Sequence, residues 1–214
     1  MLILISLPFL ASPDVRDDGA ALFFYTLLGT AWLGGATFLF PLLGVSVRDD
    51  VTERHNRGAG VAILGALAGV TLCFIGSNIG TGPGVDAVLF CAALATLTFF
   101  LCWLILELYA SPSEQITVER DFGAGIRLAG LTTSLGIVLG SAVAGDWGSW
   151  AGTLRDFLFY GWPAILLLAL ALLVERNRAG QSGLMSWSIQ QSSVIAILYL
   201  SVSVLFVFIR GDLL

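Results

Sequence analysis

Four polar side chains stand just inside the ends of long apolar runs of the sequence, at Glu107, Arg127, Gln190 and Gln191. Ionisable groups are costly to place inside a membrane, so they indicate either a function or a partner. A carboxylate, a guanidinium and two amides at one depth would make a polar pocket open to one side, suited to protons or small ions. Alternatively, Glu107 and Arg127 pair or extend to the interface and only hold neighbouring helices together.

Other patterns that carry chemistry are missing from the sequence. Cys73, Cys91 and Cys102 lie inside apolar runs, where a free cysteine behaves as a small apolar residue. His55 is the only histidine and cannot make a metal site by itself. Residues 80–84 (GTGPG) lack the lysine of a phosphate-binding loop. We therefore expect no enzymatic activity, no cofactor and no metal.

The composition indicates a single membrane domain. Hydrophobic residues make up 57% of the 214 residues and charged residues only 12%, and the mean hydropathy is +0.91. Soluble globular domains carry about twice that share of charged residues. The net charge of −5, with no basic stripe to neutralise phosphates, argues against a nucleic acid partner.

Long apolar runs follow one another along the chain, separated by short polar stretches. Residues 123–144 would form a helix of about 33 Å, enough to cross a hydrocarbon core of about 30 Å. Residues 1–11 are apolar but too short to span, so residues 1–20 are expected to be a separate segment lying in the interface, and a short signal-like segment at residues 1–11 is the alternative. The sequence predicts an all-α polytopic membrane protein with about six transmembrane helices, at residues 21–43, 58–79, 87–108, 123–144, 157–174 and 186–209.

The stretches between these runs are expected to be loops and turns. Pro41 should end or kink the first span. Residues 47–57 and 175–183 are densely polar and are expected to be loops, as is the polar exit at residues 111–121. Arg155 belongs to a short amphipathic connection that introduces the fifth span.

Three of the polar stretches share a sequence pattern, ERHNRGAG at residues 53–60, ERDFGAG at 119–125 and ERNRAG at 175–180. Aligning Gly58 with Gly123 gives a period of 65 residues, which indicates a duplicated hairpin. Because each copy holds two spans, successive copies enter the membrane in the same direction, unlike the inverted repeats of many transporters. The expected hairpin repeats are residues 21–84, 85–149 and 150–214.

The arginines are distributed unequally between the two ends of the predicted spans. By the positive-inside rule, the side that carries more arginine is cytoplasmic. The repeat loops are therefore predicted to be cytoplasmic and both termini to lie outside. The repeat-loop side holds Arg48, Arg54, Arg57, Arg120, Arg127, Arg176 and Arg178, and the opposite side holds Arg16, Arg155 and Arg210.

Two pairs of glycines recur at a spacing of four residues, Gly65 with Gly69 and Gly136 with Gly140. Small residues at this spacing share a helix face and let a neighbouring helix come close. The pattern predicts tight helix packing, although glycine is also simply common in transmembrane helices. The partners expected for this chain are the lipid bilayer, a second copy of the chain and other membrane proteins.

On the side opposite the repeat loops, Asn78 and Asp86 flank residues 80–84. They either line a vestibule or supply the polar groups that a turn requires.

The repeated loop-to-helix unit pairs Asn56 with the small residues 58–60 and Asp121 with the small residues 123–125, each before a glycine-rich apolar run. This unit resembles the YjfL-like bacterial inner-membrane family over residues 21–147. The resemblance implies an inner-membrane location, no assigned activity, and a link of some members to envelope stress and membrane maintenance. The chain departs from the four-helix form of that family by an extra hairpin.

Three classes of function follow from these observations. The favoured one is a structural or scaffolding membrane protein that oligomerises through its glycine-rich faces and takes part in envelope maintenance. The alternative is a channel or transporter for protons or small ions that uses Glu107, Arg127 and the nearby glutamines. A transporter is expected to carry charged groups near the bilayer midplane or a broken helix, and the sequence shows neither. An intramembrane enzyme is the third class.

Overall fold

The computed structural model describes residues 2–82, 84–179 and 188–210, which form an all-α polytopic membrane protein without strands in that part of the chain. Five helices are long and apolar enough to cross a membrane, and two shorter helices joined at a bend meet the same criteria together, as one broken span or a re-entrant loop. The prediction of about six spans is confirmed. The spans are α3 (Gly19–Thr37), α4 (Arg57–Gly76), α5 (Val85–Ala110), α7 (Phe122–Val143), the pair α8 (Trp150–Gly161) with α9 (Pro163–Ala179), and α10 (Ile189–Arg210).

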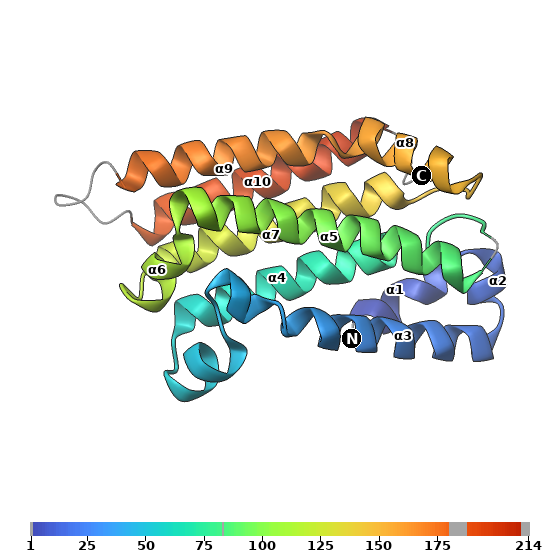
Figure 1. The fold of residues 1–214 in the computed structure, drawn as a ribbon, viewed down its shortest axis with the longest axis horizontal. Helices are drawn as coiled ribbons and strands as arrows, with labels where there is room; N and C mark the ends of the chain where they lie inside the picture. The colour runs from blue at the N-terminus through green and yellow to red at the C-terminus, as the bar shows by residue number, and fades with distance from the viewer. Residues whose placement is uncertain (1, 83, 180–187, 211–214) are drawn as a thin grey trace.

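The spans form three tandem hairpins, α3 with α4, α5 with α7, and α9 with α10 (Figure 1). The starts of α4, α7 and α10 lie at one end of the bundle, at the left of Figure 1, and the turns after α4 and α7 lie at the other end. α7 packs between α4 and α10, and α5 covers α7 while also contacting α4 and α9. The second hairpin is therefore the centre of the molecule.

The helices α4 and α7 begin in the same way. Asn56 Oδ1 accepts a hydrogen bond from the Gly58 amide at 3.0 Å, and Asp121 Oδ1 accepts one from the Gly123 amide at 2.7 Å. An asparagine or aspartate in this place satisfies an amide that the helix itself leaves open. The shared motif of the first two repeat loops thus fixes where two neighbouring spans start.

Two stretches expected to be loops are helical. Residues 47–57 contain η2 (Val47–Glu53), a π-helical turn, and residues 111–121 contain α6 (Pro112–Thr117). The side chains of the charged run close η2, because Ser46 Oγ accepts from the Asp49 amide at 3.1 Å and Asp50 Oδ2 accepts from the Ser46 amide at 2.8 Å.

The first span ends before its predicted limit at residue 43. α3 stops at Thr37 and is followed by the 3-10 turn η1 (Phe40–Leu43), which contains Pro41. Proline lacks the amide hydrogen that a continuing helix would need.

The predicted limits of the fifth span are wrong at both ends. The chain bends by 41° between α8 and α9, so Phe157, expected to open the span, lies in the middle of α8. Pro163 opens α9, a position where its missing amide hydrogen costs nothing. Glu175, expected in a loop, lies in α9 and is buried. This break between two apolar helices was not predicted from the sequence.

The N-terminal segment folds into α1 (Leu2–Leu10) and α2 (Pro13–Arg16). α1 buries Ile3 and Leu7 in a cluster with Tyr25 of α3 and Phe74 of α4. The Ser12 amide donates to the Asn78 carbonyl at 3.1 Å. This segment, expected to lie in the interface, is held by contacts to the first hairpin.

Candidate functional site

Arg127 lies at the cytoplasmic end predicted for α7 and is buried, with 1% of its surface exposed. Its guanidinium forms a two-point ion pair with Glu175 of α9, with Nε at 2.7 Å from Oε1 and Nη2 at 3.0 Å from Oε2. It also donates to Ser192 Oγ of α10 at 2.9 Å and to Gln115 Oε1 of α6 at 3.2 Å. We call Arg127, Glu175, Ser192 and Gln115 the polar lock, because they join four helices at one point.

The other predicted pocket residues do not join the polar lock. Glu107 is half-buried and accepts hydrogen bonds from the amide and the hydroxyl of Ser113, so it ties α5 to α6. Gln190 and Gln191 are exposed at the start of α10. The Gln191 side chain accepts from the Ser188 amide at 2.9 Å, which caps the helix. The structure thus brings Arg127 to Glu175 instead of to Glu107.

Glu175 was not among the predicted site residues, because hydropathy places the end of the fifth span at residue 174. α9 continues to Ala179, which leaves Glu175 inside a helix that faces α7. The available signal was the buried arginine itself, which requires a carboxylate at its own depth. Beside the pair lies a cavity of about 10 Å³ lined by Tyr199, whose buried hydroxyl has no hydrogen-bond partner among the described residues. That space is about the size of one water molecule.

The four predicted packing glycines all lie where α4 meets α7. A Cβ atom on Gly136 would meet the backbone of Gly69, and one on Gly65 would meet the backbone of Ala129. A Cβ atom on Gly140 would meet the Leu72 carbonyl. We call this contact between α4 and α7 the glycine seam. Because its glycines are buried within one chain, they are not open to a second copy.

At the opposite end of the bundle the turns after α4 and α7 bind each other. The Gly145 amide donates to the Ile79 carbonyl at 3.0 Å and the Trp147 amide donates to the Thr81 carbonyl at 2.8 Å. Asp146 Oδ1 accepts from both the amide and the hydroxyl of Thr81 at 2.8 Å. These two hydrogen bonds from Thr81 lower the pKa of Asp146. The first two hairpins are therefore joined at this end of the bundle.

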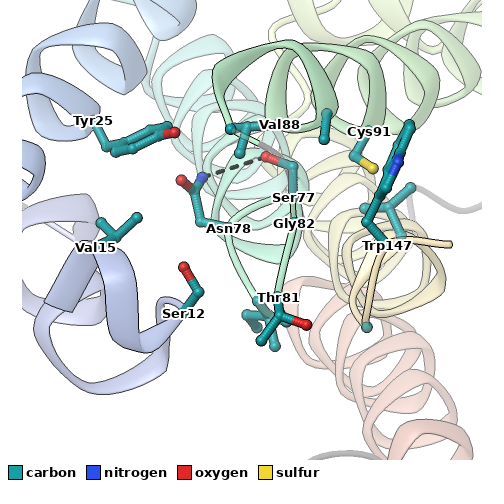
Figure 2. Close-up of a pocket in the computed structure, with 16 residues that line it drawn as sticks. Ser12, Val15, Tyr25, Ser77, Asn78, Thr81, Gly82, Val88, Cys91 and Trp147 are labelled. Atoms are coloured by element: carbon teal, nitrogen blue, oxygen red, sulfur yellow. Dashed lines mark hydrogen bonds between the residues drawn. The ribbon is translucent and has the colours of Figure 1, made fainter. Parts of the chain in front are cut away.

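A cavity of about 70 Å³ lies beside these turns, and we call it the Asn78 cavity (Figure 2). Asn78 lines it, as the sequence suggested, whereas Asp86 is exposed outside it. The Asn78 amide nitrogen donates to the Phe74 carbonyl at 2.7 Å and to Ser77 Oγ at 3.3 Å. Its oxygen is buried and accepts no hydrogen bond from the described residues. An unsatisfied buried acceptor costs about 1–3 kcal/mol.

A second cavity of about 360 Å³ adjoins the first and shares Cys91 and Trp147 with it. It is lined by the acidic side chains Asp146 and Asp156 and by Arg210. The Arg210 guanidinium lies 3.7 Å above the centre of the Tyr160 ring and donates to the Ser141 carbonyl at 2.9 Å. This end of the bundle thus offers polar hollows to the solvent.

A third hollow of about 500 Å³ is an apolar groove between α3 and α5. Trp32 Nε1 donates to Thr96 Oγ1 at 3.1 Å across it, which links the two helices.

The described residues contain no group of three or more histidine, cysteine, aspartate or glutamate side chains placed to hold a metal ion. Comparisons of the chain with protein-family models, with curated proteins and with solved structures found no match. The resemblance to the YjfL-like family stays a prediction that rests on the repeated capping motif.

Proposed function

We propose that the chain is a structural component of the bacterial inner membrane that contributes to envelope maintenance, as the resemblance to the YjfL-like family implies. The repeat loops face the cytoplasm and the ends of the chain face outward, in keeping with the distribution of arginine.

The tightly packed middle of α7, which carries no charged side chain between Arg127 and Val143, is the observation that supports this proposal. Its polar side chains are the hydroxyls of Thr132, Thr133, Ser134 and Ser141. Arg127 and Val143, which lie beside the hollows at the two ends, are separated by about 24 Å of helix. Between them Leu131, Leu135 and Leu139 are at most 1% exposed. The glycine seam holds α4 against this stretch with no room for a methyl group. Such tight packing favours a rigid structural role for the chain over a polar pathway for ions through it.

Transport of protons or small ions is the second candidate. It is favoured by the buried ion pair of Arg127 with Glu175 and by the break between α8 and α9, since charged groups and broken helices mark transport sites.

Ion flux into proteoliposomes separates the two candidates. The structural proposal predicts proton, sodium and potassium flux at the level of empty vesicles for the wild-type chain. A wild-type flux that Glu175→Gln abolishes, while Glu107→Gln retains it, would overturn the structural proposal in favour of transport through the polar lock.

Complementation tests the structural proposal in cells. In a host whose own copy is deleted, we expect the wild-type chain and Glu107→Gln to restore resistance to membrane stress. Gly136→Leu, which forces the glycine seam apart, should not restore it at matched protein level. Equal resistance with and without the gene would contradict a role in envelope maintenance.

A further inference from the structure

The oxygen of Asn78 is a buried acceptor aimed into a cavity. Asn78 is 4% exposed, and its amide nitrogen donates a hydrogen bond to the Phe74 carbonyl. Turning the amide over would set its oxygen against the Phe74 carbonyl oxygen, so the oxygen is the atom that faces the cavity. Asn78 Oδ1 therefore has capacity for a hydrogen-bond donor or a cation.

The surroundings of the Asn78 cavity favour positive charge. It lies at the C-terminal end of α4, where the helix dipole is negative. None of the described residues that line it carries a charged side chain. Two carboxylates lie close to the cavity and add negative charge. Asp146 accepts hydrogen bonds from Thr81, which lines the cavity, and Asp86 lies on the first turn of α5.

Further oxygens lie on the same side of the cavity. Figure 2 shows the Asn78 oxygen turned toward the side where Tyr25 and Ser12 present their hydroxyls. Hard cations in proteins take oxygen ligands, and divalent ones are usually held by carboxylates. The lining offers hydroxyl and amide oxygens but no carboxylate among the described residues, which selects a monovalent ion.

We propose that the Asn78 cavity binds a small monovalent cation, of sodium or potassium size, with Asn78 Oδ1 as a ligand and the hydroxyls of Ser12 and Tyr25 beside it. The bound ion connects Ser12, in the turn between α1 and α2, with Tyr25 of α3 and with Asn78 after α4. It reinforces the hydrogen bond that the Ser12 amide donates to the Asn78 carbonyl. Binding therefore steadies the N-terminal helices on the first hairpin.

Thermal unfolding of the purified full chain in lipid nanodiscs tests the proposal. The chloride salts of sodium, potassium and N-methylglucamine are compared at one ionic strength, since the last cation is too large for the cavity. At ten times its Kd the bound ion should raise Tm by about 4 °C over N-methylglucamine. Hydrogen exchange at the Ser12 amide should slow under the same conditions.

Substitutions of residues that line the cavity test whether the salt-specific rise in Tm comes from this site. Asn78→Leu should abolish the salt-specific rise in Tm. Ser12→Ala and Tyr25→Phe keep the Asn78 hydrogen bonds and should each raise the half-saturating cation concentration several-fold, so they decide the matter if Asn78→Leu does not fold. Thr37→Ala, at the opposite end of α3, is the matched control and should leave the response unchanged.

Two results would overturn the proposal. An identical Tm in all three salts means that the cavity holds water only. A salt-specific rise that persists in both Ser12→Ala and Tyr25→Phe means that the ion binds elsewhere. Neither result bears on the structural role, which the flux and complementation experiments test separately.

Discussion

The two sides of α7 differ in what they add to close helix packing. Toward α4, the glycine seam brings backbone against backbone with no side chain between them. Toward α9 and α10, the polar lock sets the buried guanidinium of Arg127 against Glu175 and Ser192. Both sides include a close approach of backbones, since a Cβ atom on Gly130 would meet the backbone of Ala196 in α10, but only the second side carries a buried ion pair. The duplicated hairpin therefore repeats the close helix contact, and the third hairpin adds to it a buried ion pair.

Breaking the polar lock should give the largest loss of stability. Arg127→Met leaves Glu175 buried without its cation, which is expected to cost about 3–5 kcal/mol. The free energy of unfolding in detergent micelles measures this. Replacing both partners by methionine should recover most of the loss, because no buried charge then remains. Arg176→Met, at the exposed neighbour of Glu175, is the control and should be almost neutral.

Filling the glycine seam should have the next largest effect. Gly136→Ala puts a methyl group into the Gly69 backbone and is expected to cost about 1–3 kcal/mol. Gly35→Ala in α3 meets nothing within 4 Å and should be neutral or stabilising. Equal unfolding free energies for the two variants would show that α4 and α7 are not in backbone contact.

The same substitution on the other face of α7 sharpens the comparison. A Cβ atom on Gly123 would meet the Ser192 hydroxyl, which can rotate away at the loss of its hydrogen bond from Arg127, whereas the Gly69 backbone cannot move in this way. We therefore expect Gly123→Ala to cost less than Gly136→Ala in the same unfolding assay. A larger cost at Gly123 would mean that the polar face is the more rigid one.

Protonation of Asp146 should give the smallest effect. Its pKa is lowered by the hydrogen bonds from Thr81, so its contribution is present above the unfolded pKa of about 3.9 and is lost as the pH falls through the lower folded value. Tm measured against pH should fall less steeply over that window in Asp146→Asn than in the wild type. Thr81→Val, which removes one of the two bonds, should lie between them.

The spans were predictable where apolar runs and capping residues agree, as at Asn56 and Asp121, which mark the starts of α4 and α7. Hydropathy alone could not place the break before Pro163, because both sides of it are apolar. Hydropathy also could not show that α9 continues past Glu175, since a charged residue lowers the hydropathy and predicts a loop unless its buried partner is known. Arg127 and Glu175 are 48 residues apart in the sequence, so only the tertiary structure shows that they pair.

Cysteine labelling tests the central arrangement most directly, namely that all three hairpins cross the membrane in the same sense. Single cysteines replace the exposed residues Thr52, Glu119 and Gln190 at one end and Thr81 and Gly148 at the other. The native cysteines are buried, so the unaltered chain serves as the background. We predict that a membrane-impermeant maleimide reaches Thr81→Cys and Gly148→Cys from outside intact cells and reaches the other three only after the membrane is opened. Labelling of Thr52→Cys, Glu119→Cys and Gln190→Cys from different sides would contradict the three parallel hairpins.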